Sequence, residues 1–184
     1  LKGPVFIDSY SNLHAHTIIK GGTIIGPNSN IGGEISNSII QGHTNKGHYG
    51  YLGNSYIGEW ANFGAGTTTS NLKNNYSSVR VRLINKVVET NKIKIGSFVG
   101  DYVKTAIGTT LNSGTIINFG CNVVTGNFPP QYLKPFRWYY NGSESLYEWD
   151  KFIETLRLIK TKKNVTITKN EIEFLRKKYL YYSK

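Results

Sequence analysis

Aliphatic residues that recur at every sixth position constrain this chain more than any other feature. The first run has no gap and passes through Ile7, Leu13, Ile19, Ile25 and Ile31. A second run passes through Ile40, Lys46 and Leu52, shifts by one, and continues through Ile57 and Phe63. A third run passes through Val99, Thr105, Leu111, Ile117 and Val123. A period of six fits neither an amphipathic helix nor an alternating strand.

The period predicts an all-β fold, a parallel β-helix of hexapeptide repeats, over residues 1–128. Three sixes make one coil, and each coil buries its aliphatic side chains only by stacking on a neighbour. Small residues at the corners fit this interpretation, at Ser11, Thr17, Thr23 and Ser29. Residues 67–98 break the period, and residues 79–83 alternate like a strand before Asn85 and Lys86. We therefore expect an excursion built as a loop and a hairpin, of the kind that usually serves binding.

The chain changes character after residue 128, so we expect a cap and a helical appendage over residues 129–184. The aromatic run at 136–140 is predicted to seal the open end of the prism. Apolar residues then recur at helical spacing, and Thr168 with Glu171 resembles a capping box. Two helices are predicted, at about 144–161 and 169–182.

Composition narrows the class of protein. The 184 residues are 39% hydrophobic and include 20 glycines, as expected for one globular domain of short strands and tight turns. A single cysteine, Cys121, excludes an internal disulfide and fits a reducing, cytoplasmic compartment. No apolar run is long enough to span a membrane, and no signal peptide is visible. The start at Leu1 and the lack of methionine suggest a piece of a longer polypeptide.

The net charge of +11 is concentrated at the C-terminal end. Residues 151–184 hold ten Lys or Arg against three Glu, which gives +7. A basic tail is compatible with nucleic-acid binding, but the solvated outer faces of two helices explain it as well. No recognition motif accompanies the charge, so we expect neither a nucleic-acid nor a membrane partner.

The stretch at 47–71 reads GHYGYLGNSYIGEWANFGAGTTTSN. With the six-residue phase, it resembles the C-terminal acetyltransferase half of bifunctional sugar-1-phosphate nucleotidylyltransferase/acetyltransferases. The resemblance covers about residues 5–126 and is greatest to archaeal and Bacteroidetes-type relatives. It implies a left-handed β-helix, a homotrimer with sites at subunit interfaces, and acetyl-CoA as co-substrate. It also implies N-acetylation of an amino-sugar 1-phosphate, with a nucleotidylyltransferase domain upstream.

The resemblance assigns roles to four residues of this stretch. His48, in the GH-x-x-Y-L-G motif, would be the general base, and Tyr51 would contact the sugar phosphate. Asn62 precedes an IGAG-like turn and would bind the amino sugar. Asn71, five residues after that turn, would lie near the acetyl-CoA thioester. We expect these residues to converge because the six-residue period puts them on neighbouring levels of one prism.

Further substrate contacts are expected from Glu34, Lys20 and Arg80. Glu34 matches an acidic sugar-binding position, Lys20 a basic phosphate ligand, and Arg80 a basic position of archaeal-like relatives. Ser36 and Ser77 stand where the family has lysines, so the phosphate end of the site departs from the pattern.

Acetyl transfer explains why these residue types are needed. The acceptor amine must lose a proton, which a neutral imidazole can take, and the tetrahedral oxyanion then needs a hydrogen-bond donor. A backbone N–H of the turn containing Ala65 and Gly66 would serve, and glycine there lets the cofactor approach closely. Lys104 is expected to meet phosphates of the cofactor, although a plain surface lysine is an equally simple interpretation.

Two other functions compete with acetyl transfer. The first is a zinc-dependent, carbonic anhydrase-like site using His43 and His48 with His14 or His16. Those upstream histidines are out of step with an 18-residue coil, and catalytic zinc requires three convergent ligands, so we expect no metal. The second is a non-catalytic, trimerising or regulatory domain, which the two missing lysines favour.

Overall fold

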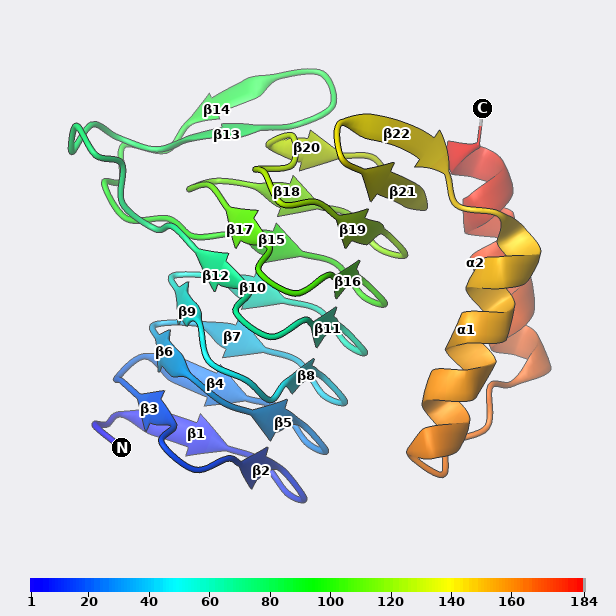
Figure 1. The fold of residues 1–184 in the computed structure, drawn as a ribbon, viewed down its shortest axis with the longest axis horizontal. Helices are drawn as coiled ribbons and strands as arrows, with labels where there is room; N and C mark the ends of the chain where they lie inside the picture. The colour runs from blue at the N-terminus through cyan, green and yellow to red at the C-terminus, as the bar shows by residue number, and fades with distance from the viewer. Residues whose placement is uncertain (184) are drawn as a thin grey trace.

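A computed structural model of the protein describes residues 1–183. Short strands stack in it as a prism with three walls, and two helices lie along one side (Figure 1). The first wall, sheet A, is parallel and consists of β1 (Val5–Ile7), β4 (Thr23–Ile25), β7 (Ile39–Ile40), β10 (Tyr56–Ile57), β15 (Phe98–Val99), β18 (Ile116–Ile117) and β20 (Tyr132–Leu133). Non-consecutive strands pair throughout, so the chain coils around the prism axis.

The other two walls complete each coil. Sheet B consists of β2 (Asn12–Leu13), β5 (Asn30–Ile31), β8 (Asn45–Lys46), β11 (Asn62–Phe63), β16 (Lys104–Thr105), β19 (Asn122–Val124), β21 (Arg137–Tyr140) and β22 (Ser143–Leu146). The third wall, which we call sheet C, combines two parallel sheets. One consists of β3 (Ile18–Ile19), β6 (Glu34–Ser36) and β9 (Tyr51–Gly53), and the other of β12 (Thr68–Thr69) and β17 (Thr110–Leu111). Hydroxyl contacts of Thr69 with the backbone of Tyr51 and Gly53 join β9 to β12. The predicted parallel β-helix is confirmed.

The six-residue spacing places one side chain of each strand inside the prism. Ile7 pairs with Ile25, Ile25 with Ile40, and Ile40 with Ile57, which makes a ladder of aliphatic side chains. All but Ile7 are essentially inaccessible to solvent. At roughly 0.8 kcal/mol per buried methylene, such ladders are the main stabilising term of the prism.

One corner explains why the period shifts after Ile31. Only Gly32 and Gly33 separate β5 from β6, and Gly33 has a φ of 83°. A Cβ on Gly32 would collide with the carbonyl of Gly47, so only glycine fits this tight corner. The coil from Ile25 to Ile40 has 15 residues, whereas the coil from Ile7 to Ile25 has 18. The Gly32–Gly33 corner shortens the step from Ile31 to Ile35 by two residues, and the step from Ile35 to Ile40 is shorter by one.

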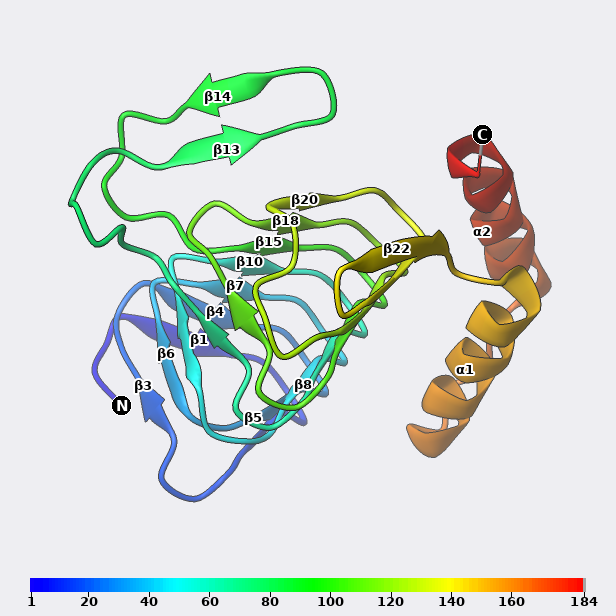
Figure 2. The same cartoon turned by 45° about the horizontal axis from the view of Figure 1, so that its top comes forward.

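The excursion leaves the prism between β12 and β15, as predicted. Its strands β13 (Arg80–Arg82) and β14 (Val87–Glu89) form an antiparallel hairpin that turns back at Lys86 (Figure 2). The hairpin overhangs the upper part of sheet A, where Val81 and Leu83 share a groove with Phe98 and Tyr132.

The sheets continue past residue 128, where a boundary was expected. β20 pairs with β18 and β21 pairs with β19, so residues 132–140 add a further coil. The aromatic run lies within that coil as β21. Tyr139 closes the prism core, and Phe136 begins a second apolar cluster outside it.

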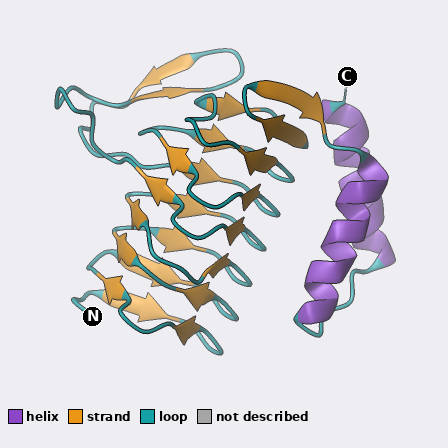
Figure 3. Cartoon of the chain, viewed as in Figure 1, coloured by secondary structure: helices purple, strands orange, loops and turns teal. Residues whose placement is uncertain are grey.

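The predicted start of the first helix at residue 144 is wrong. Residues 143–146 form β22, which pairs antiparallel with β21 (Figure 3). Asn141 and Gly142 both have positive φ, which favours a tight hairpin turn, and Glu144 pairs with Arg137 at 3.1 Å. Leu146 belongs to this strand, although it continues the helical spacing.

Helices α1 (Trp149–Lys162) and α2 (Lys169–Tyr182) pack along the corner between sheets A and B. Their aromatic and aliphatic faces meet Phe136 in the second cluster, with Phe152, Leu156, Leu175 and Tyr179. Thr168 caps α2 by accepting a hydrogen bond from the Glu171 N–H at 3.1 Å. The Glu171 carboxylate bonds to Tyr102 and Lys160, so it ties the helices to the prism.

Candidate functional site

The His48 turn lies directly against the glycine-rich turn of the next coil, at the corner between sheets B and C. Residues 47–50 connect β8 to β9, and residues 64–67 connect β11 to β12. The Gly66 N–H donates to the Tyr49 carbonyl at 3.1 Å. A Cβ on Gly50 would collide with the Thr67 carbonyl, so the contact requires glycine. His48 is exposed at this corner.

A buried lysine supports the His48 turn from inside the prism. Lys46 is 2% exposed and stands in the inward ladder of sheet B, after Ile31. Its Nζ donates to the carbonyl oxygens of Gly32 at 3.0 Å and His48 at 2.9 Å. Burial lowers the pKa of Lys46 to about 8. The ammonium therefore satisfies the carbonyl oxygens of two turns, at the cost of its own desolvation.

Four of the predicted site residues meet on the outer face of sheet C. Glu34 and Tyr51 are register partners on β6 and β9, and Lys20 forms a 2.5 Å ion pair with Glu34. The hydrogen bond to Glu34 and its charge raise the pKa of Lys20. The Asn71 amide donates to the Tyr51 hydroxyl at 3.0 Å. Lys20, Glu34, Tyr51 and Asn71 are thus one connected surface.

Two side chains that the sequence did not single out as ligands complete this surface. Ser36 Oγ lies 2.9 Å from the Tyr51 hydroxyl, in the position where the family has lysine. Asn54 Oδ1 accepts a 2.6 Å hydrogen bond from Asn71 Nδ2. A Cβ on Gly53 would collide with the Tyr51 hydroxyl, so the glycine lets the ring lie flat along the sheet.

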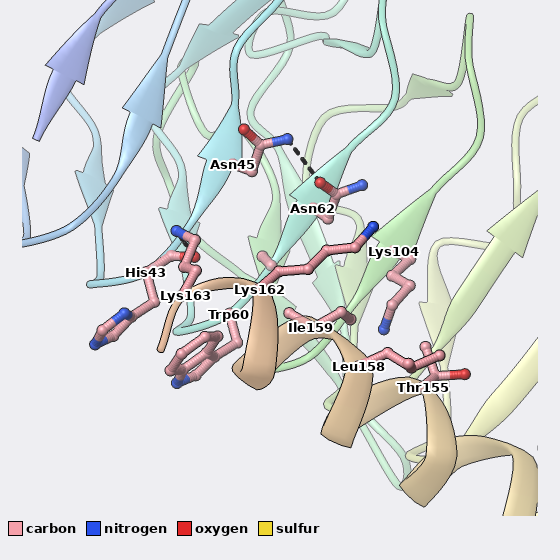
Figure 4. A pocket seen from close by; sticks show the side chains of 11 residues that line it. His43, Asn45, Trp60, Asn62, Lys104, Thr155, Leu158, Ile159, Lys162 and Lys163 are labelled. Carbon is pink, nitrogen blue, oxygen red and sulfur yellow. Dashed lines mark hydrogen bonds between the residues drawn. The ribbon is translucent and has the colours of Figure 1, made fainter. Parts of the chain in front are cut away.

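Asn62 and Lys104 lie on a different wall, the outer face of sheet B. They are register partners on β11 and β16, and Asn62 Oδ1 accepts a 2.7 Å hydrogen bond from Asn45. Both line a cavity of about 430 Å³ beneath α1 (Figure 4). The corner with His48 and Gly66 separates this wall from the Tyr51 surface. Asn62 and Tyr51 therefore lie on either side of the His48 corner and do not share one face of the prism.

The remaining predicted residues divide between the corner and the hairpin. Ala65 and Gly66 lie in the turn above His48, and the Ala65 carbonyl accepts a 2.7 Å hydrogen bond from Gly108 in the following coil. Arg80 lies on β13, outside the prism, and its Nε is 3.8 Å from Glu89 instead of joining the Tyr51 surface.

The histidines divide between two corners of the prism. His43 has a φ of 60° at the corner between sheets A and B and stacks on Trp60 at 4.0 Å. His48 is at the other corner of sheet B. The imidazole of His14 lies against Gly47, the residue before His48. Within residues 1–183, no group of three His, Cys, Asp or Glu side chains is placed to hold a metal ion.

Lys46 was missed as a functional candidate although its signal was visible. A lysine at an aliphatic position of the six-residue period, two residues before His48, is unexpected for an inward side chain. By contrast, nothing in the sequence indicates that Lys162 and Lys163 of the helical tail would line a cavity with Asn62. In the part of the chain that the structure describes, no helix has the length and apolar character to cross a membrane.

Comparisons with known proteins bear on this arrangement. No protein-family model matches the chain. It is 35% identical over 109 residues to the bifunctional protein GlmU of Methanocaldococcus jannaschii, covering 59% of this chain and 26% of that protein. A bifunctional sugar-1-phosphate nucleotidylyltransferase/acetyltransferase of Sulfurisphaera tokodaii is 33% identical over 93 residues, covering 50% of this chain and 23% of the relative.

A third relative, the bifunctional protein GlmU of Methanococcus vannielii, is 33% identical over 121 residues, covering 66% of this chain and 28% of that protein. The chain therefore spans about a quarter of the length of these relatives. With the β-helix described above, the matches show that the chain is homologous, over part of its length, to the C-terminal region of bifunctional sugar-1-phosphate nucleotidylyltransferase/acetyltransferases.

Proposed function

We propose that the chain carries an N-acetyltransferase site that moves acetyl from acetyl-CoA to the amine of an amino-sugar 1-phosphate. The observation that carries the proposal is the contact between the exposed His48 turn and the Gly64–Ala65–Gly66 turn, with the Tyr51 surface on the adjoining wall. A base and a turn with one uncommitted backbone amide meet there, and acyl transfer to an amine requires a base and an oxyanion donor.

The backbone of the glycine-rich turn indicates which N–H group would face the oxyanion. The Gly64 N–H donates to the Thr105 carbonyl and the Gly66 N–H to the Tyr49 carbonyl. The Ala65 N–H is the remaining amide between them. We assign it to the developing oxyanion, since a donor that is not committed within the fold can be offered to the transition state.

In the proposed reaction, His48 takes a proton from the amine as the amine nitrogen attacks the thioester carbon. The tetrahedral oxyanion receives the Ala65 N–H, and collapse breaks the carbon–sulfur bond. The coenzyme A thiolate leaves and takes the proton back from the His48 imidazolium. Atoms and charges balance without a metal or an oxidant.

The acceptor would lie against the outer face of sheet C. Tyr51, Glu34 and Asn71 offer hydroxyl, carboxylate and amide groups to a sugar, and Lys20 offers charge to its phosphate. Asn62 lies on the outer face of sheet B, on the other side of the corner. The acetyl group, held at residues 64–66, would meet the amine beside His48.

We also propose that the chain forms a homotrimer through sheet A. An unbroken row of apolar side chains runs in register along its outer face, through Phe6, Ile24, Ile39, Tyr56, Phe98, Ile116 and Tyr132. The first five are 38–56% exposed, more contiguous apolar surface than a monomer usually leaves in water. We refer to these seven residues as the apolar row.

Release of free thiol from acetyl-CoA, measured with glucosamine-1-phosphate and with galactosamine-1-phosphate, tests the activity. His48→Ala should lower kcat by at least about a hundredfold, because a general base contributes about 10²–10⁴. His16→Asn is the matched control, since His16 is exposed at the same kind of corner and asparagine tolerates its φ of 62°. Equal turnover in wild type and His48→Ala would refute the assignment.

A second candidate is a non-catalytic module of a nucleotidylyltransferase. The bond between Ser36 and Tyr51 favours it, because Ser36 replaces an expected lysine and engages the tyrosine hydroxyl within the chain. Absence of thiol release with either sugar, in protein that is folded and assembled, would support this candidate over the enzyme.

A further inference from the structure

The cavity beneath α1 combines apolar walls with cationic groups. It occupies about 430 Å³ between the outer face of β8, β11 and β16 and the last turns of the helix. Trp60, Leu158 and Ile159 supply apolar walls. Lys104, Lys162, Lys163 and His43 supply the ionisable groups, and no carboxylate is among the described residues that line it.

Three hydrogen-bond donors remain available to a ligand there. The ammonium of Lys104 has only a long contact of 3.4 Å with the Tyr102 carbonyl. Lys162 extends its amino group toward Asn62 in Figure 4. Because Asn62 Oδ1 accepts from Asn45, the Nδ2 group of Asn62 points away from Asn45 and toward the amino group of Lys162 (Figure 4). The Lys104 amino group points toward Thr155. By contrast, Lys163 already donates to the Asn28 and His43 carbonyls, at 2.8 and 3.0 Å.

We propose that this cavity is a binding site for a phosphate-bearing ligand, held by Lys104, Lys162 and Asn62. Cationic donors and an amide N–H suit phosphate oxygens, and charge-assisted hydrogen bonds are the stronger ones. The apolar walls would take the less polar part of the same ligand. The phosphate belongs either to acetyl-CoA or to a separate phosphorylated molecule, and the site does not depend on acetyl transfer.

The charges around the cavity support the same conclusion. Burial lowers the pKa of Lys104 to about 8. Burial, followed by the charges of Lys163 and Lys160, lowers the pKa of His43, and burial lowers that of Lys163. Lys160 itself is paired with Glu171 at 2.8 Å. A bound dianion would stabilise the protonated form of Lys104, so it should bind more tightly as the pH falls through about 8.

Calorimetric titration of the full chain with inorganic pyrophosphate tests the proposal. We expect saturable binding, weakened at least about tenfold in Lys104→Met and in Lys162→Met, because each removes one charge-assisted contact. Lys151→Met is the matched control, an exposed lysine on the first turn of α1 that pairs with Glu148. Since Lys162 is exposed, its variant should fold even if the Lys104 variant does not.

Two further arms complete the experiment. Sulfate, whose charge is constant near neutral pH, should bind more weakly as the pH rises through about 8. Displacement of pyrophosphate by acetyl-CoA would identify the coenzyme as the source of the phosphate, and retention would identify a separate ligand. No saturable binding at millimolar pyrophosphate, or equal affinity in the Lys162 and Lys151 variants, would overturn the proposal.

Discussion

Lys46 stabilises two turns by placing a charged group in the apolar core. Its neighbours in the inward ladder of sheet B are aliphatic or aromatic, at Ile31 and Phe63, whereas Lys46 places an ammonium within the prism. The amino group holds the carbonyls of Gly32 and His48. The ammonium therefore links two stacked corners, and one of them carries the proposed base.

Lys46→Met should remove a pH dependence of the stability of the fold. The pKa of Lys46 falls from 10.5 to about 8, which corresponds to a cost of about 3 kcal/mol for the charged form. The two lost hydrogen bonds come from a charged donor and are worth about 1.5 kcal/mol or more each, so they offset this cost, and the variant should match wild type within about 1 kcal/mol at neutral pH. Because the native state binds the proton less tightly than the unfolded state, the cost is complete below pH 8 and fades between pH 8 and 10.5.

Chemical denaturation across that pH range measures the effect. Lys86→Met, at an exposed position in the hairpin turn, is the control; it retains Lys46, so its stability relative to wild type should not change with pH. If Lys46→Met were less stable than wild type at neutral pH, the turn hydrogen bonds would outweigh the desolvation of the ammonium.

At the scale of elements, the site depends on two turns being in contact. Gly50 has a φ of 125°, and its Cα faces the Thr67 carbonyl. A side chain there would separate the His48 turn from the turn that contains Ala65.

Gly50→Ala should destabilise the protein by about 2 kcal/mol or more, since both backbone strain and a collision oppose it. Gly126→Ala is the matched control, because a Cβ on Gly126 would meet no atom within 4 Å and its φ lies outside the left-handed region. The control should stay within about 0.5 kcal/mol of wild type. Equal midpoints of urea unfolding for the two variants would contradict the need for glycine at this turn.

The six-residue period predicted the strands better than it predicted which parts of neighbouring coils lie side by side. It identified the inward residues and the excursion, because burial repeats with each strand. It did not reveal that two short steps, from Ile31 to Ile35 and from Ile35 to Ile40, reduce one coil to 15 residues, and that shortening decides which corners lie side by side. Helical spacing from Leu146 similarly misplaced the start of α1, because pairing across the Asn141–Gly142 turn outweighs local periodicity.

The site was predictable to a similar extent. The motif brought attention to Tyr51 and Asn71, whose side chains do meet. It did not indicate that Asn62 faces another wall, since the face of a side chain depends on its coil. The lysines of α1 could not have been placed, because docking of the helices depends on the long-range aromatic cluster around Phe136.

At the scale of the whole molecule, the apolar row on sheet A would become an interface if three copies associate. The groove between the hairpin and Phe98 continues that surface at the upper end. Trimer formation would thus bury the row and position the hairpin against a neighbour.

Ile39→Lys, in the middle of the apolar row, should convert the trimer to monomer, because association would bury an unpaired charge. Sedimentation equilibrium measures the mass directly. Leu180→Lys is the control, since Leu180 is exposed on α2 and lies outside the row. A wild-type chain that sediments as a monomer would exclude the trimer, and an unchanged trimer in Ile39→Lys would exclude this face.

The pair of helices also has a consequence for how the prism unfolds. A solenoid in which each coil contacts only its neighbours tends to lose structure coil by coil. Here Lys163 is bonded to Asn28 and His43, while Glu171 is bonded to Tyr102 more than fifty residues further along the chain. Because these hydrogen bonds link distant coils to the same pair of helices, we expect those coils to unfold together. The first coil precedes these contacts, so we expect it to unfold separately.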